Sequence, residues 1–386
     1  MKMKSRCVVF LIMLLVFAGV GTVSSAGQTG PPPGLSGGIN GTVTINRPDS
    51  LPDTGYFGFM ANTQQGVASG AGLWGKVRID GDPLLWEPIA IALSCVTGKT
   101  ELTTVTGVDG RFGITRVNLP QVYTLAGDVR NQMEQHYEGC TVRAELAGYR
   151  SSTDTITEKV LRDKPFLDDI TLTREENAPG TDISEVAGSS SAEAESWYQK
   201  AHDEWVHGNA DGARKDLEQV VKIDPKRAEA WYLLGRLQAA SDLKAATESL
   251  QQAQTLDPRF VPPCEWLALI AIQKRDWPTA NSWASRALAL HPSGSAWLWY
   301  ENAVADYRMG KNEAARAAAE HAMAMDPEHN VQNAEEVLAL TLINKGDYSA
   351  ALDHLRNSLT YMTGSSADLI KRQIAFVEQK TGADRK

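Results

Sequence analysis

Two different hydrophobic periods divide the sequence. Between residues 73 and 173 apolar positions alternate with polar or small ones, and this period of two predicts half-buried β-strands. Turn-forming steps such as Asp80-Gly81 and Asp109-Gly110 separate the predicted strands. Short strands at this spacing predict an all-β sandwich. The apolar phase of three strands consists of Leu73, Gly75, Val77 and Ile79; Ile89, Ile91, Leu93 and Cys95; and Cys140, Val142, Ala144 and Leu146.

From Ala194 onward the period becomes helical and a repeat emerges. A three-residue motif of an apolar residue, a polar residue and a proline occurs four times. Its prolines are spaced by 33, 34 and 35 residues, at Pro225, Pro258, Pro292 and Pro327. Small apolar residues stand at fixed distances before each proline, where they let two helices cross closely. They are Ala213, Ala246, Ala280 and Ala315, then Val220, Ala253, Ala287 and Ala322. The pattern resembles the tetratricopeptide repeat. It implies an all-α solenoid of about five repeats over residues 194–363, followed by a capping helix and tail over 364–386.

The turns of the β region resemble those of carboxypeptidase regulatory-like domains. Residues 75–83 (GKVRIDGDP) are similar to the opening "GxVxDxxGxPL" pattern of that family, residues 104–112 (TVTGVDGRF) to its "TxTDxDGxF" segment, and Ala147–Tyr149 to its "xxGY" turn. The resemblance implies a transthyretin/Cna-B-like β-sandwich over residues 73–173. Residues 115–138 are longer and more polar than the usual connection of the family, and we expect an extra hairpin there, at 121–129.

The N-terminus has the three parts of a secretory signal peptide. Basic residues between Lys2 and Arg6 precede an apolar run from Cys7 to about Val20, and small residues end at Ala26. We expect residues 1–26 to be removed and the protein to be exported, either to the periplasm or as a secreted protein. The alternative is a retained single-pass anchor. Residues 27–72 are rich in Pro and Gly and predict a loosely ordered lead-in, and residues 174–193 predict a flexible linker.

Composition narrows the function classes. The chain of 386 residues has a net charge of −9 and no basic block, so it is a poor candidate for binding nucleic acid, which requires clustered cations. After Ala26 no apolar stretch approaches the roughly 20 residues of a membrane helix, and we expect no membrane insertion after signal cleavage.

The residues with potential chemistry favour a non-enzymatic protein. Cys95 and Cys140 lie on the apolar phase of their predicted strands, and in an exported protein they can form a disulfide, with two separate buried thiols as the alternative. Cys264 occupies an inner helical position and is interpreted as a core residue. The seven histidines form no metal-ligand pair, and the sequence has no phosphate loop or nucleophile elbow. We therefore predict no enzymatic activity, no cofactor and no metal.

A binding surface for a protein or peptide partner remains as the leading hypothesis. In tetratricopeptide arrays the first helix of each repeat lines a concave groove, and aromatic and Arg side chains are suitable anchors for a peptide. The residues that this resemblance assigns to the groove are Tyr198, His202, Trp205, Tyr232, Arg236, Glu265, Trp297, Tyr300, Tyr307 and Arg308. The alternative for any one of them is packing between neighbouring repeats.

Two other functions are compatible with the sequence. The first is binding of a carbohydrate or cell-wall glycan to the β-sandwich, for which Trp74 and Trp86 are the candidate stacking residues, with the repeats serving assembly. The second is a structural part of an envelope or pilus apparatus.

Overall fold

The computed structural model describes residues 72–81, 83–95, 100–115, 137–162, 166–184, 191–326, 331, 333–362 and 364–383. The predicted signal peptide, almost all of the predicted lead-in and the predicted hairpin at 121–129 lie outside these residues. The described residues fall into two compact units. The first contains residues 72–230 and Asp257–Phe260, and the second contains Trp231–Leu256 and the residues from Val261 onward.

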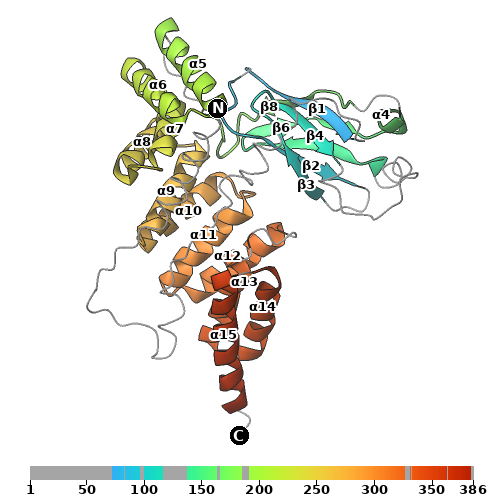
Figure 1. The fold of residues 1–386 in the computed structure, drawn as a ribbon, viewed down its shortest axis with the longest axis vertical. Coiled ribbons are helices and arrows are strands. Elements are labelled where there is room, and N and C mark those ends of the chain that lie inside the picture. The colour runs from blue at the N-terminus through green and yellow to red at the C-terminus, as the bar shows by residue number, and fades with distance from the viewer. Residues whose placement is uncertain are drawn as a thin grey trace, which may run out of the picture. The chain divides into compact units, whose positions relative to one another are not determined.

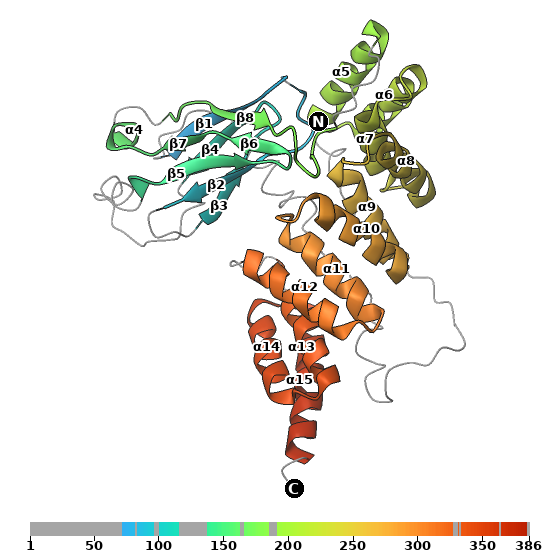
Figure 2. The ribbon, with the colours of Figure 1, turned by 180° about the vertical axis from the view of Figure 1, so that it is seen from behind.

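The first unit contains two β-sheets, each with four strands in the described part of the chain. One has the strand order β4-β1-β8-β6 and the other β3-β2-β5-β7, and β1 pairs with β8 in parallel (Figures 1 and 2). Side chains of both sheets, among them Val77, Ile91 and Ile170, form one hydrophobic core. The strands are β1 (Gly72–Ile79), β2 (Ala90–Ser94), β3 (Thr100–Val105), β4 (Arg111–Thr115), β5 (Thr141–Glu145), β6 (Tyr149–Ser151), β7 (Thr153–Thr155) and β8 (Ile170–Arg174), with a short helix α4 (Glu158–Arg162).

The register between β2 and β5 brings two cysteines together. These strands are antiparallel, and Ser94 pairs with Thr141. The next residues outward, Cys95 and Cys140, are therefore directly opposite each other, with Cα atoms 4.2 Å apart and their sulfurs joined in a disulfide. The bridge thus links neighbouring strands of one sheet, beside a core that contains Cys140.

Eleven helices follow in the described residues, and α5 packs on α6, α9 on α10, α11 on α12 and α13 on α14 as sequential pairs. In the second unit α9 also contacts α11, and α11 contacts α13, so that alternate helices lie side by side as in a helical solenoid (Figure 1). The helices are α5 (Ala192–Val206), α6 (Ala210–Ile223), α7 (Ala228–Gln238), α8 (Leu243–Leu256), α9 (Val261–Gln273), α10 (Trp277–Leu290), α11 (Ala296–Arg308), α12 (Asn312–Met325), α13 (Asn333–Lys345), α14 (Tyr348–Tyr361) and α15 (Gly364–Ala383).

The repeated small residues are located where helices approach closely. All eight residues at the two repeated small-residue positions, from Ala213 to Ala322, are fully buried. A Cβ at Gly235 would lie 2.8 Å from the Leu250 side chain and 3.0 Å from the Ala246 carbonyl oxygen, so α7 and α8 cross where only glycine fits. Small side chains at these positions therefore set the spacing of each helix pair.

The aspartates of the repeated Asp-Pro step are buried, and two of them bind backbone amides. Asp224, Asp257 and Asp326 are at most 7% exposed. The Asp257 carboxylate accepts a bond of 3.0 Å from the Arg259 amide, and that of Asp326 accepts one of 2.5 Å from the Val331 amide. Because these carboxylates satisfy amides in the loop after a helix, they fix the path of the chain into the next helix pair.

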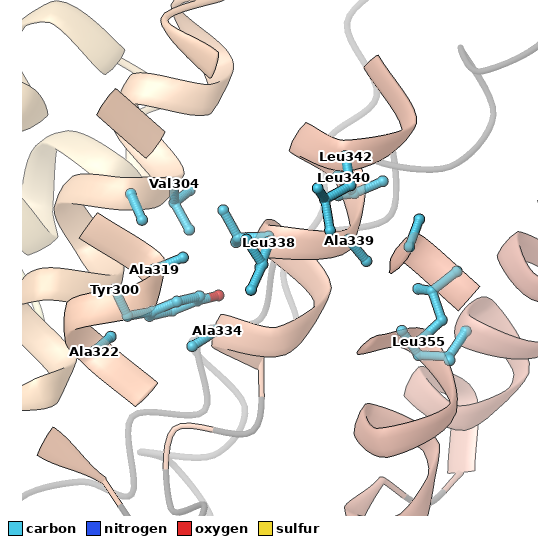
Figure 3. Packing of buried hydrophobic residues seen from close by; sticks show 14 of the residues in the cluster. Tyr300, Val304, Ala319, Ala322, Ala334, Leu338, Ala339, Leu340, Leu342 and Leu355 are labelled. Atoms are coloured by element: carbon cyan, nitrogen blue, oxygen red, sulfur yellow. The ribbon is translucent and has the colours of Figure 1, made fainter. Parts of the chain in front are cut away.

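The largest core of the second unit lies between α11 and α15. Tyr300 packs its ring beside Ala319 and Ala322 of α12 and Ala334 of α13 (Figure 3). Leu338 and its neighbours on α13 extend this core, which reaches Leu355 of α14 (Figure 3). Among the helices that the structure describes, none combines the length and the apolar character required to cross a membrane.

Part of the segment predicted as a linker makes specific contacts within the first unit. Thr181 is fully buried and forms a β-bridge with Phe260. The Arg259 guanidinium donates a hydrogen bond to the Ala178 carbonyl, and the Ser184 hydroxyl donates one of 2.7 Å to Asp257. The polar composition of this segment gave no indication of this packing, because the contacts join residues more than 70 positions apart.

Candidate partner-binding surface

The residues assigned to the predicted groove fall into both compact units. Tyr198, His202 and Trp205 lie on α5 in the first unit, and the other seven lie on α7, α9 and α11 in the second.

The three α5 residues contact a turn of the β region in the first unit. The Trp86 ring centroid lies 5.5 Å from that of Tyr198 and 5.3 Å from that of His202, edge-on to the imidazole. Nε2 of His202 donates to the Leu85 carbonyl oxygen at 2.9 Å, and Nε1 of Trp205 donates to the Trp86 carbonyl oxygen at 3.2 Å. Tyr198 and His202 are consequently buried. In this structure the chain's own turn occupies the positions that the repeat pattern assigns to a partner.

Charged groups surround the Tyr198 ring. The Arg227 guanidinium carbon lies 3.5 Å from the ring centroid, and Arg227 also pairs with Glu195 at 2.8 Å. Burial, together with the nearby Glu229 carboxyl, holds the pKa of Tyr198 well above its usual value. Burial likewise raises the pKa of Glu229. These residues form a tightly packed polar core, so Tyr198 has a structural role here.

The predicted residues of α7 and α9 have varied surroundings. Tyr232 is 4% exposed, whereas Arg236 and Glu265 are half-buried. Beside Glu265, the Cys264 thiol donates a hydrogen bond of 2.9 Å to the Gln254 side-chain oxygen. Burial raises the pKa of that thiol to about 12, which agrees with the interpretation of Cys264 as a core residue.

The three aromatic candidates on α11 differ in accessibility, and Tyr307 is half-buried, with its pKa raised by burial. Trp297 is half-buried and stands perpendicular to Tyr300, with ring centroids 5.8 Å apart. Tyr300 is 2% exposed and belongs to the hydrophobic core of Figure 3. A ring with so little exposed surface cannot contact a partner. Tyr300 therefore packs against Trp297 and holds it in place.

Arg308 at the end of α11 and Glu336 on α13 carry opposite charges that are partly removed from water. The Arg308 guanidinium carbon lies 5.1 Å from the Trp277 ring centroid, and burial lowers the pKa of Arg308. Burial raises the pKa of Glu336 on α13, although a hydrogen bond of 2.7 Å from Gln373 and the charge of Arg308 oppose this shift. Both side chains remain half-buried. We call Trp277, Trp297, Arg308 and Glu336 the α11–α13 face.

Sequence reasoning missed Trp277 and Glu336. Glu336 could have been found, because the 36-residue offset between Gly310 and Gly346 carries Tyr300 onto Glu336 in the fifth repeat. The fifth repeat lacks the proline by which the other repeats are aligned, so the equivalence of Glu336 to Tyr300 was not recognised. Trp277 begins α10, which is a second helix of a pair, so the groove positions of the repeat do not include it.

The two tryptophans predicted to stack on a sugar, Trp74 and Trp86, differ in how much of each ring is exposed. Trp86 is only 6% exposed, so it is not available to stack on a sugar. Trp74 is half-buried, and its ring lies so close over Gly113 that a Cβ there would be 2.4 Å from it. Within the described part of the chain no three potential ligands gather to form a metal site.

Comparison with known proteins identifies the helical repeats. Residues 198–259 match the family model of the tetratricopeptide repeat. A search of curated proteins found no significant match to the sequence. Among solved structures, MamA of Desulfovibrio magneticus RS-1 is similar with 17% identity over 44% of this chain and 95% of its own, at a TM-score of 0.40. YrrB, described as a tetratricopeptide protein with an unusual peptide-binding site, has 15% identity over 46% of this chain and 90% of its own, at a TM-score of 0.42. The matched residues, together with the packing of alternate helices, identify the C-terminal region as a tetratricopeptide-like helical solenoid.

Proposed function

We propose that this protein is an exported, non-enzymatic scaffold that binds a protein or peptide partner on the α11–α13 face of its helical repeats. One observation carries the proposal. Arg308 and Glu336 have opposite charges and burial-shifted pKa values, yet both are still half-exposed, and Arg308 lies against the half-buried Trp277. Partly desolvated charges next to aromatic anchors are typical of binding sites, because a partner completes their removal from water.

The chemistry of this face indicates the kind of partner. Arg308 offers a planar guanidinium for a carboxylate or a backbone carbonyl, and Trp297 offers an apolar surface for a side chain. Helical repeats with such residues bind peptides through a few anchors surrounded by weaker contacts. Because Trp297 and Arg308 lie at opposite ends of α11, about 16 Å apart along the helix axis, a peptide segment whose apolar and acidic residues are several positions apart fits both anchors.

The test is capture of partners from the native envelope by the chain that begins at Gly27. Trp297→Ala and Arg308→Ala should each weaken the captured complex by about 30-fold, which corresponds to about 2 kcal/mol for a central anchor. Trp283→Ala on α10 and Arg316→Ala on α12 are matched controls from second helices, and they should retain binding. If the folded Trp297 and Arg308 variants bind normally while the controls lose the partner, the α11–α13 face is the wrong surface.

Export is the second part of the proposal, and it rests on the N-terminal sequence alone. The basic start, the apolar run and the small residues before Gly27 support it. N-terminal sequencing of the protein from fractionated cells should give a mature chain that begins at Gly27 in the exported fraction. An intact Met1 in the membrane fraction would instead indicate a retained anchor.

A further inference from the structure

We propose that the turn before β2 is an intramolecular ligand of the first helix pair. The turn consists of residues 84–87, and we call it the Trp86 turn. It would occupy the positions on α5 that the repeat pattern assigns to a partner, which leaves the corresponding positions of the later repeats for binding. This inference rests on the proposed function for the meaning of the α5 positions, although the contact itself is independent of any partner.

The Trp86 turn binds α5 in the way that a peptide binds a receptor. Trp86 is only 6% exposed, and its indole lies against Tyr198 and His202. A large ring in a connecting segment is seldom removed from water unless another element covers it. Here α5 supplies that cover, and Trp86 is the aromatic anchor of the turn.

Two consecutive backbone carbonyls of the turn are bound by α5 side chains. The Leu85 carbonyl accepts from Nε2 of His202 at 2.9 Å, and the Trp86 carbonyl accepts from Nε1 of Trp205 at 3.2 Å. Because a carbonyl only accepts, Nε2 of His202 must carry the proton. His202 and Trp205 are three residues apart on one helix and therefore share a face. Recognition of backbone carbonyls together with one buried aromatic anchor is a mode of peptide binding, not only apolar packing.

The receptor side of this contact is held in place by its own neighbours. Arg227 lies 3.5 Å from the Tyr198 ring centroid and pairs with Glu195 on α5 at 2.8 Å. The Glu229 carboxyl also lies close enough to Tyr198 to raise the pKa of its hydroxyl. Tyr198 is thus fixed by groups other than the turn, and loss of Trp86 should leave a formed but uncovered site. The sequence assigned this site to a partner, and in the structure the chain itself fills it.

Hydrogen exchange of the mature chain without partner tests the proposal. In Trp86→Ala, amides of α5 should exchange at least about tenfold faster, because a central aromatic anchor contributes enough free energy for a change of this size. Trp74→Ala is the matched control, since it removes the other tryptophan of the β region, which lies over Gly113. It should leave α5 exchange within about twofold. Equal exchange of α5 in the two folded variants would overturn the proposal.

Variants on the helix side keep the test decisive if Trp86→Ala unfolds the β region. Trp205→Phe keeps an aromatic ring but deletes the Nε1 donor, and His202→Ala deletes the other donor. Both should speed exchange in a peptide that covers residues 83–89 while β1 and β8 remain protected. Unchanged exchange of that peptide in both variants would also overturn the proposal. Because no partner is present, these results are separate from the success or failure of partner capture.

Discussion

Loss of the disulfide between Cys95 and Cys140 should destabilise the β region by about 4 kcal/mol. The two cysteines are 45 residues apart in the sequence. A crosslink that closes a loop of this length lowers the entropy of the unfolded chain by about 13 cal/mol/K, or about 4 kcal/mol at 25 °C. The register of β2 and β5 places the two residues opposite each other, so the folded sheet accommodates the bridge in its own pairing. Reduction should therefore raise the unfolded fraction of this region by about three orders of magnitude.

The assay combines thiol counting with denaturant-dependent hydrogen exchange, on the chain that begins at Gly27. Cys264 is an internal reference, because it is fully buried and its pKa is raised to about 12. The native protein should show no reactive thiol. Denaturation without reductant should expose one thiol, at Cys264, and denaturation after reduction should expose three. Exchange in β2 and β5 then gives the free energy of opening with and without reductant, and with Cys95→Ala combined with Cys140→Ala.

Two outcomes would contradict this reasoning. Three reactive thiols after denaturation without reductant would show that Cys95 and Cys140 are not bridged. A bridged protein whose free energy of opening changes by less than about 1 kcal/mol on reduction would show that loop closure does not control its stability. Helix α12 is the control region, because it lies in the other compact unit and should be unaffected.

Two further predictions concern stability. His354 donates a hydrogen bond of 2.5 Å to the buried Glu335 carboxylate, which raises the pKa of His354; Asp353 and Glu320 raise it further. The ion pair stabilises the fold fully below the unfolded pKa of about 6.5, and this stabilisation is lost as the pH rises through the higher folded pKa. In urea unfolding of the wild type, the free energy of unfolding should therefore decline over this pH range. His354→Gln should remove that pH dependence. Gly113→Ala should cost about 1–3 kcal/mol of unfolding free energy, because its Cβ would lie 2.4 Å from the Trp74 ring. The cost should fall in a Trp74→Ala background, and an equal cost in both backgrounds would exclude the ring as its cause.

Local patterns in the sequence predicted the helical repeats in detail. The alanines from Ala246 to Ala322 and the aspartates of the Asp-Pro step recur in register, and the structure shows both sets buried at helix crossings and loop entries. Such positions are predictable because each repeat contacts mainly its neighbours, so the constraint that acts on a residue recurs along the sequence. Alternation predicted the β-strands for the same kind of local reason, since every second side chain points to the core.

The covering of the aromatic positions was decided only by the tertiary structure. The repeat pattern identifies Tyr198 and Tyr300 as equivalent groove positions, yet Tyr198 is covered by Trp86, and Tyr300 is enclosed by α12 and α13. Periodicity states which face of a helix a residue occupies, but not which distant segment covers that face. The contact between Trp86 and α5 joins residues more than 100 positions apart, and no local signal in either segment indicates the other. The sequence by itself therefore determined the elements and their repeat, and long-range packing determined which of the predicted anchors remain accessible to a partner.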